Sequence, residues 1–366
     1  KKKSVENFLR FSFLLETINF LSLHQTISNI MKKNVALALS SGGPRGFAYI
    51  GAIEELVERG YNITSIAGTS IGSLIGGVYA CGALPQFKEW LYSLDAWKVF
   101  TLMDLSISKN HFVKGDKIIS AMKEVVPDIN IEDLPIPYCT IATDLYTGQE
   151  VVFNTGKLFD AIRASISIPS LFRPVKYGLT TLIDGGIANC LPMSRVARSG
   201  EDILVAFDVN HVDVDEIRQI LLREHDARQK DESFEIQKRT EMRELIAHVK
   251  STEDTLLTRL KYAGSKSISL LKDVISYRKA FDEDTALDYD DNYYDILDRT
   301  FNLMNHHNTE LAIQIHQPDV LVRMPFDAYG AISDYAKASE IAEIGRQLMS
   351  DALNKYESAN VDSLSI

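Results

Sequence analysis

The sequence predicts an α/β protein built on a mainly parallel sheet, and two observations carry this prediction. Short apolar runs typical of buried strands alternate along the chain with segments of helical spacing. In the first two of these units, a glycine-rich turn stands where the strand passes into the helix. Alternating strands and helices favour parallel strands with helices covering both faces of the sheet.

The first unit begins with the apolar run NVALAL at residues 34–39, which is typical of a buried strand. A glycine-rich turn follows at Ser40–Gly46, and residues 47–59 then carry apolar side chains at helical spacing. Gly60 is a residue type that commonly ends a helix. This segment therefore predicts a strand, a glycine loop and a helix.

The second unit repeats this order. We expect a strand at Ile63–Ala67, a sharp turn at Gly68–Gly72 and a helix over Ser70–Cys81 that ends at Gly82. Further strands are expected at Tyr138–Thr143, Glu150–Phe153, Thr180–Ile183, Ile203–Val209 and Val320–Met324.

The remaining segments suggest the division of the chain. Residues 212–300 are rich in charge and helical in spacing, which predicts a helical insertion, and residues 333–355 predict a closing amphipathic helix. The acidic stretch 282–291 lacks the EF-hand spacing and favours a solvated face over a metal site. The expected parts are an N-terminal extension 1–30, a core domain 31–210, a mostly helical insertion 211–310, and the final core strand and helix with a tail at 311–366.

Composition narrows the class of protein. Apolar residues make up 45% and charged residues 24%, the balance of a globular chain, and the net charge of −11 argues against nucleic-acid binding. Three widely spaced cysteines argue against a disulfide framework. The apolar stretch 8–23 is interrupted by polar residues, so we expect no signal peptide. We expect a cytoplasmic protein, with contact at a membrane surface still open to it.

The sequence Gly68-x-Ser70-x-Gly72 has the spacing of a nucleophile elbow. In such an elbow the serine hydroxyl stands exposed at the carboxyl edge of the sheet, and the helix N-terminus favours developing negative charge. The alternative is a serine that caps the helix beside packing glycines. The strand before the motif and the helix after it favour the nucleophile.

The loop Gly42-Gly43-Pro44-Arg45-Gly46 also joins a strand to a helix, where backbone N–H groups can point at an anion. Two interpretations compete, a phosphate loop and an oxyanion hole for acyl transfer. Neither the Walker pattern nor G-x-G-x-x-G is present, which favours the oxyanion hole. Pro44 has no N–H, so its neighbours must donate.

An acid rather than a histidine stands out as the base. A Ser-His-Asp triad requires a histidine, and His211, which follows a strand, is the best of eight candidates. The strand at Thr180–Ile183 instead ends in Asp184-Gly185-Gly186, where a carboxylate can approach the elbow. The alternative for Asp184 is an aspartate of an ordinary turn.

Together these segments resemble the patatin-like phospholipase family, which combines a G-G-x-[RK]-G loop, a G-x-S-x-G elbow and a D-G-[GA] acid. The chain has all three in that order, and Arg163–Pro169 resembles the family's stretch upstream of the acid. Ser41 departs from the pattern, since many members carry a glycine there. The resemblance covers residues 33–210 with the last strand and helix.

The resemblance implies a three-layer α/β/α fold and hydrolysis of lipid acyl esters, of the phospholipid or lysophospholipid class, by a Ser70–Asp184 dyad. It implies no metal or other cofactor. We expect N–H groups around Gly42, Gly43, Arg45 and Gly46 to form the oxyanion hole, and the Arg45 side chain to anchor its loop. The expected partner is a lipid ester, with transient membrane contact. The alternatives are a silent lipid-binding protein on the same fold, an esterase using His211, and a nucleotide-binding protein.

Overall fold

The structure is a computed structural model, and the expected N-terminal extension lies outside the residues that it describes, as does most of the expected insertion. The described residues are 33–94, 98, 101, 105–108, 111–113, 115–215, 217–219, 222, 293–326, 328–329 and 333–363. The four-part division of the chain therefore stays a prediction.

The main sheet has eight strands, seven of them in the order β11-β10-β1-β2-β5-β9-β8, with β6 also paired to β5. The four pairings from β11 to β5 are parallel, whereas β6, β9 and β8 are added antiparallel. The predicted mainly parallel sheet is thus confirmed. The bounds are β1 Asn34–Leu39, β2 Asn62–Thr69, β5 Tyr138–Asp144, β6 Glu150–Phe153, β8 Val175–Tyr177, β9 Thr180–Asp184, β10 Ile203–His211 and β11 Val320–Pro325.

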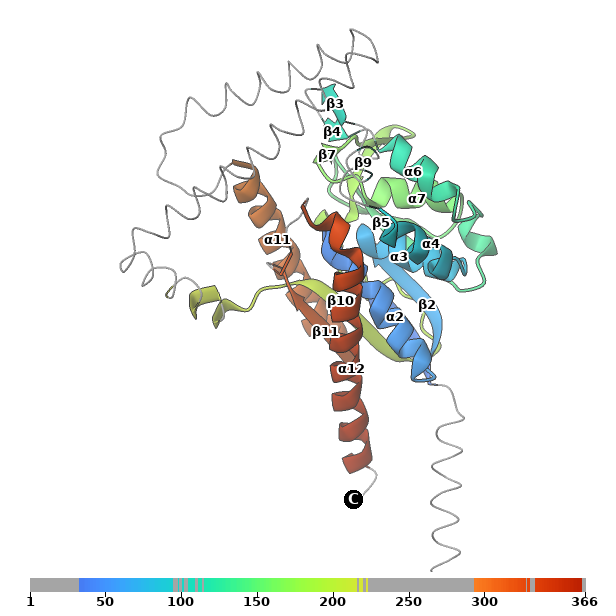
Figure 1. The fold of residues 1–366 in the computed structure, drawn as a ribbon, viewed down its shortest axis with the longest axis vertical. Coiled ribbons are helices and arrows are strands. Elements are labelled where there is room, and N and C mark those ends of the chain that lie inside the picture. The colour runs from blue at the N-terminus through green and yellow to red at the C-terminus, as the bar shows by residue number, and fades with distance from the viewer. Residues whose placement is uncertain are drawn as a thin grey trace, which may run out of the picture.

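Helices cover both faces of this sheet (Figure 1). Their bounds are α2 Ala48–Glu58, α3 Ile71–Ala80, α4 Leu84–Tyr92, α6 Asp116–Lys123, α7 Leu158–Ser165, α11 Tyr293–His316 and α12 Ala338–Ser363, with one-turn 3₁₀ segments at Gly43–Phe47, Ile131–Asp133, Gly185–Ile187 and Ser333–Lys337. A small second sheet joins β3 Leu105–Ser108, β4 His111–Val113 and β7 Ser170–Phe172. These short strands, and β8, were not predicted from the sequence.

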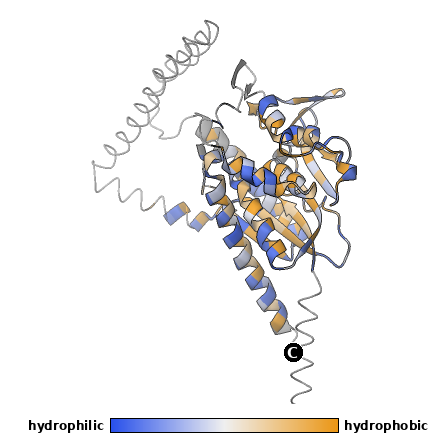
Figure 2. Ribbon diagram, turned by 45° about the vertical axis from the view of Figure 1, so that its right-hand side comes forward, coloured by the Kyte–Doolittle hydropathy of each residue, from blue (hydrophilic) through white to orange (hydrophobic). Residues whose placement is uncertain are grey.

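The alternation of side chains along β1 explains the layers. Val35, Leu37 and Leu39 point to the larger core, which also contains buried residues of α2, α3, α7 and α12. Ala36 and Ala38 point to the opposite face, where the segment around Leu191–Val196 and α11 pack. Apolar strands between partly polar helices are visible in Figure 2. The result is the three-layer α/β/α arrangement that the resemblance implied.

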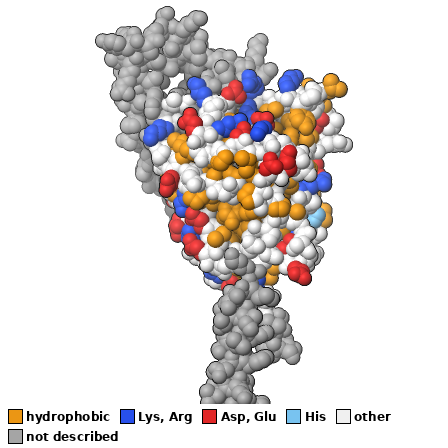
Figure 3. Space-filling model, turned by 90° about the vertical axis from the view of Figure 1, so that its right-hand side faces the viewer, with side chains coloured by type: hydrophobic (Ala, Val, Ile, Leu, Met, Phe, Trp, Pro, Cys, Tyr) orange, Lys and Arg blue, Asp and Glu red, His pale blue; other side chains and the backbone are white. Residues whose placement is uncertain are grey.

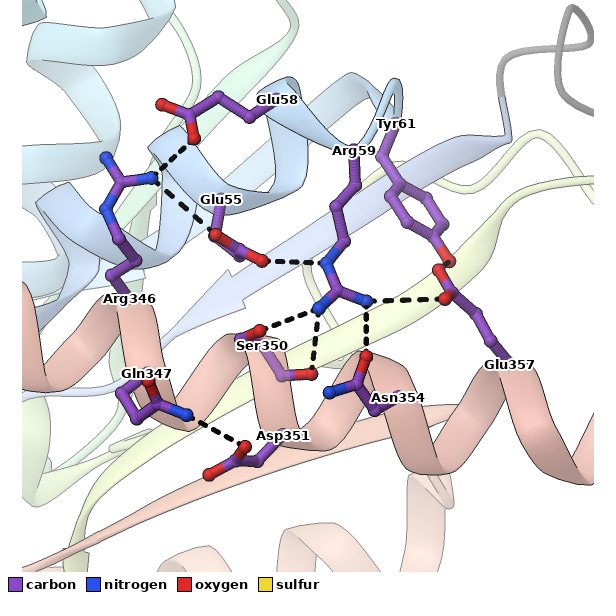
Figure 4. A network of polar contacts seen from close by, with 10 residues as sticks. All are labelled: Glu55, Glu58, Arg59, Tyr61, Arg346, Gln347, Ser350, Asp351, Asn354 and Glu357. Carbon is purple, nitrogen blue, oxygen red and sulfur yellow. Dashed lines mark hydrogen bonds and ion pairs between the residues drawn. The ribbon is translucent and has the colours of Figure 1, made fainter.

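The closing helix α12 packs closely along α2. A Cβ atom added at Gly345 would lie 1.9 Å from the carbonyl oxygen of Ala48, and one at Gly51 would lie 1.9 Å from that of Ala342. The two glycines therefore allow the helix backbones to touch. Further along, Arg59 donates to Glu55, Ser350 and Asn354, and these contacts tie the two helices together (Figure 4). Within the described part of the chain, no helix is long and apolar enough to span a bilayer.

Candidate active site

Ser70 occupies the sharp turn between β2 and α3, at the carboxyl edge of the parallel strands. Its backbone has φ 55° and ψ −119°, and it is one of two non-glycine residues with positive φ in the described chain. Such a conformation is unfavourable for a serine and persists where surrounding contacts impose it. Here the Ser70 N–H donates to Ser165 Oγ at 2.8 Å, and Ser73 Oγ donates to the Ser70 carbonyl at 2.6 Å.

The glycines of the elbow are required by close packing. A Cβ atom at Gly68 would lie 2.3 Å from the carbonyl oxygen of Gly72, and one at Gly72 would lie 2.5 Å from that of Leu39. Neither glycine has a positive φ, so the unusual backbone angles fall on Ser70 itself. The motif thus lets the start of α3 sit directly against the ends of β1 and β2.

Asp184 lies against the Ser70 hydroxyl. Ser70 Oγ donates to Asp184 Oδ2 at 2.5 Å, and the Gly186 N–H donates to Asp184 Oδ1 at 2.8 Å. The backbone of Asp184 is held as well, since its N–H donates to the Ser167 carbonyl at 2.9 Å and its carbonyl accepts from Thr143 Oγ1 at 2.7 Å. Both carboxylate oxygens therefore have a defined partner.

The antiparallel course of β9 brings this acid to the elbow. In the sheet, Asp184 pairs with Ala142 of β5, and the neighbouring Ile141 pairs with Thr69 of β2. Because β9 runs opposite to β2, its first residues lie past the carboxyl ends of the parallel strands. Only its last residue, Asp184, reaches the level of Ser70. The expected approach is found, although the strand arrives from the opposite direction to the parallel strands.

Burial changes the acidity of Asp184. Its side chain is 7% exposed, and the loss of solvation raises its pKa from 3.8 to about 6. The hydrogen bonds from Ser70 and from the Gly186 N–H oppose this rise because they stabilise the carboxylate. Asp184 is therefore a stronger base than an exposed aspartate, yet is ionised at neutral pH.

The glycine loop passes beside the elbow with two glycines in unusual conformations. Gly42 has φ 152° and Gly43 has φ 58°, and a Cβ atom at Gly42 would lie 2.3 Å from Val209. The two N–H groups before Gly42 already have acceptors. The Ser40 N–H donates to the Phe207 carbonyl, and the Ser41 N–H donates to the Cys190 carbonyl. The N–H groups of Gly42 and Gly43 have no acceptor within the described part of the chain. They are available to a bound oxyanion.

The Arg45 side chain is buried and anchors the loop, as expected. Its guanidinium donates to the carbonyl of Gly42 at 3.0 Å, to the carbonyl of Phe326, and to Asn302 Oδ1 at 2.7 Å. Gly46 also packs against the elbow helix, because a Cβ atom there would lie 2.3 Å from Ile71. Gly185 is similarly confined, with a Cβ position 2.1 Å from the Ile141 carbonyl oxygen, and Gly186 lies against Ser41.

Several residues that hold the site were not identified from the sequence. Ser165 lies in the recognised stretch before the acid, but its bonds to the Ser70 N–H and to the Ile141 carbonyl carry no motif of their own. Asn302 and Asn305 lie on α11, within the expected insertion, and contact Arg45 and Ser41 respectively. Only tertiary contact reveals them.

His211 contacts side chains of α11. Its ring stacks edge-on against His306 at 5.9 Å between centroids, and its Nδ1 lies 3.9 Å from Glu310 Oε1. The hydrogen-bond partner of Ser70 Oγ is Asp184. An acid, and not this histidine, thus lies at hydrogen-bond distance from the Ser70 hydroxyl.

This domain combines an α/β sheet and a serine elbow with a buried acid at hydrogen-bond distance from the serine and an adjoining glycine loop. This is the combination that the resemblance to the patatin-like family predicted. Residues 37–196 match the family model described as patatin-like phospholipase. The matched range contains the elbow, the acid and the glycine loop, but neither α11 nor α12.

Curated relatives carry related names. An "Uncharacterized NTE family protein" of Mycobacterium tuberculosis is 46% identical over 176 residues, which cover 48% of this chain and 49% of the relative. "Lysophospholipase NTE1" of Debaryomyces hansenii is 30% identical over 200 residues, which cover 53% of this chain and 13% of that protein. The chain thus matches about half of the length of the mycobacterial relative and a small part of the yeast one.

Among solved structures, VipD from Legionella pneumophila matches with a TM-score of 0.33 and 17% identity, covering 51% of this chain and 52% of that one. This resemblance is too slight to support a conclusion about function.

Proposed function

We propose that this protein is a serine acyl hydrolase that cleaves acyl esters of lipids, of the phospholipid or lysophospholipid class. The observation that carries the proposal is the 2.5 Å hydrogen bond from Ser70 Oγ to Asp184 Oδ2 in a buried site. A short hydrogen bond to a carboxylate of raised pKa is what a serine nucleophile with a directly attached base requires. The relative named lysophospholipase supports the choice of substrate class.

In the proposed reaction, Asp184 takes the proton of Ser70 Oγ as the oxygen forms a bond to the ester carbonyl carbon. The tetrahedral intermediate then collapses, the bond to the leaving alcohol breaks, and protonated Asp184 returns the proton to that oxygen. Water repeats the sequence on the acyl-enzyme, with Asp184 again as base, and the fatty acid leaves Ser70.

The oxyanion of this intermediate is expected to lie at the glycine loop. The N–H groups of Gly42 and Gly43 have no protein acceptor in the described chain, and the turn that continues through Arg45 and Gly46 adjoins them. Preorganised donors of this kind commonly lower a barrier by roughly 3 kcal/mol each. The start of α3 at Ser70 contributes a favourable helix dipole.

Transient contact with a lipid surface is also proposed, on the basis of an exposed apolar tip at the edge of the sheet near Ser70. The tip is formed by Leu145 and Tyr146 after β5 and by Tyr177 and Leu179 of the β8–β9 hairpin, and Leu179 is fully exposed. The Leu145 N–H donates to Thr181, which joins the two turns. Leucine and tyrosine side chains suit the interfacial region of a membrane. Apolar side chains also gather across the face drawn in Figure 3, where acidic and basic groups interrupt them.

The alternative is a catalytically silent protein that binds lipid on the same fold. Labelling by a fluorophosphonate probe, which reacts with activated serines, separates the two. We would compare the wild-type chain with Ser70→Ala and Asp184→Asn, using Asp144→Asn as the matched control. Asp144 ends β5 at the same edge of the sheet but accepts its hydrogen bonds from the following turn.

The proposal predicts labelling of the wild type and the Asp144→Asn variant, and loss of labelling in the other two. Hydrolysis of lysophospholipids and of esters of increasing acyl length would then define the substrate. An unlabelled but folded wild-type chain would instead support the silent binding protein. Labelling that persisted in Asp184→Asn would remove the acid from its proposed role.

A further inference from the structure

A cluster of four potential metal ligands lies between the sheet and α11. Asp208 and His211 come from the end of β10, and His306 and Glu310 stand four residues apart on α11. One ligand atom from each of the four lies within 4.8 Å of the others. Spacing of four places both α11 side chains on the same face of that helix, toward the strand.

The strand alternation shows how Asp208 comes to be buried beneath α11 while the other three residues of the cluster are partly buried. Leu204 and Ala206 of β10 point into the small core beneath α11, and Asp208 is the next residue on that face. The apolar layer between β10 and α11 therefore gives way to polar side chains toward the carboxyl edge of the sheet. Ala312 and Ile313 of α11 pack against the same apolar layer as Leu204 and Ala206.

Two buried atoms of this cluster lack a hydrogen-bond partner. Asp208 is 0% exposed, and although its Oδ1 accepts the Asn210 N–H at 2.8 Å, its Oδ2 has no hydrogen bond. The buried Nδ1 of His211 also has none. A buried carboxylate oxygen without a hydrogen-bond partner is costly, and binding of an ion is one established explanation for such an atom.

The neighbouring groups are arranged as supports for a bound cation. Arg323 of β11 donates to Glu310 Oε1 at 2.5 Å, which fixes the orientation of the Glu310 carboxylate. The other carboxylate oxygen is then the one that would bind a metal. The Val212 N–H contacts His306 Nδ1 at 3.3 Å, a long contact that a metal on that nitrogen would replace. Two carboxylates face one guanidinium in this cluster, so the acidic groups contribute an excess of negative charge. A divalent cation would compensate that charge.

We propose that Asp208, His211, His306 and Glu310 form a binding site for a divalent transition-metal ion of the Zn²⁺ type. Two imidazoles and two carboxylates are a donor set that such ions accept, whereas Mg²⁺ and Ca²⁺ prefer oxygen ligands alone. Tetrahedral ligands at about 2.1 Å from zinc lie roughly 3.4 Å apart, so the most widely spaced ligand atoms, which lie within 4.8 Å of one another, must draw together by up to about 1.4 Å when the ion binds.

The proposed ion has a structural role. It connects β10 to α11, the helix whose Asn302 and Asn305 contact Arg45 and Ser41 in the glycine loop. Asn210, whose N–H is held by Asp208, donates through its side chain to the Ser41 carbonyl at 2.7 Å. The ion would therefore fix the outer support of the loop while taking no part in the Ser70–Asp184 chemistry.

The test uses the untagged full chain, stripped of metal with a chelator and then titrated with Zn²⁺ and with Co²⁺. We expect one equivalent of either ion to bind, and the Co²⁺ form to show the intense visible absorption of four-coordinate cobalt. The variants His306→Ala and Glu310→Gln should weaken binding by at least about 10-fold. His307→Ala is the matched control, because His307 is exposed on the same helix and lies outside the cluster.

Circular dichroism establishes that each variant is folded, and the melting temperature gives a second measurement. Zn²⁺ should raise the melting temperature of the wild type and of His307→Ala but not that of His306→Ala. A wild-type chain that binds neither ion would overturn the proposal, as would equal binding by wild type and the folded cluster variants. Repeating the titration with Ser70→Ala keeps this result independent of the proposed hydrolysis.

Discussion

The main-chain N–H of Ser70 donates to Ser165 Oγ at 2.8 Å, and the same Ser165 hydroxyl donates to the Ile141 carbonyl at 2.5 Å. One buried side chain at the end of α7 thereby links the turn that carries the proposed nucleophile to the central strand β5. Ser165 contacts the backbone of Ser70 and not its hydroxyl, so we expect it to act by holding the Ser70 backbone in place.

Ser165→Ala should therefore lower kcat for a short-chain ester by roughly 10-fold, with little change in KM, because a small misplacement of a nucleophile is costly. It should also reduce the free energy of unfolding by about 1–3 kcal/mol, since two buried backbone groups lose their partner. Steady-state kinetics and urea unfolding check both effects. Ser120→Ala removes a serine hydroxyl that donates to a backbone carbonyl on the exposed side of α6, and should change neither.

The pH dependence of hydrolysis should report the ionisation of Asp184. The proposed base acts as a carboxylate, and burial raises its pKa to about 6. We expect kcat/KM to fall with decreasing pH below about 6 and to level off above it. Asp144→Asn should leave this profile unchanged. A profile without an inflection between pH 4 and 8 would contradict the assignment of Asp184 as base.

Asp184 should also make the free energy of unfolding depend on pH, but this dependence should run in the direction opposite to that of activity. Between pH of about 4 and 6 the folded state retains a proton on Asp184 that the unfolded state has lost, so this group makes stability fall as pH rises. Asp184→Asn should consequently raise the free energy of unfolding at pH 8 by about 1–3 kcal/mol and have little effect near pH 4. Urea unfolding at the two pH values measures the difference, and equal effects at both would disprove it.

Asn302 of α11 should matter to the reactivity of Ser70 through Arg45. Asn302→Ala removes an acceptor 2.7 Å from the buried guanidinium, which in turn holds the Gly42 carbonyl. We expect the rate of fluorophosphonate labelling to fall by roughly 10-fold as the loop loosens. Asn308→Ala is the control, since its contact with Ile187 is long at 3.5 Å. Unchanged labelling of Asn302→Ala would show that the loop holds its position without α11.

The contact of α2 with α12 should be sensitive to a single methyl group. Gly345→Ala would place Cβ 1.9 Å from the Ala48 carbonyl oxygen, and the strain should lower the free energy of unfolding by about 3 kcal/mol. Gly60→Ala meets no atom within 4 Å, and its φ of +82° should cost only about 1 kcal/mol. Urea unfolding of the two variants side by side tests whether close packing sets the larger cost.

The sequence by itself determined the features that depend on neighbouring residues. The apolar run of β1 gave a strand with the predicted bounds, and Gly68-x-Ser70-x-Gly72 identified the elbow because its packing constraints act within one turn. Asp184 was singled out from a strand followed by two glycines, but its proposed role came from the resemblance of the three motifs together to the patatin-like family. Sequence patterns of this kind are readable because backbone geometry restricts residue type locally.

Tertiary structure alone decided which distant residues meet. The contacts of Ser165, Asn302 and the four residues of the proposed metal site could not be predicted from local patterns, since their partners come from other elements. The antiparallel course of β9 likewise depends on pairing with β5 and places Asp184 beside Ser70. A side chain's partners across the sheet are set by the pairing of strands and the packing of helices, and no single stretch of sequence contains that information.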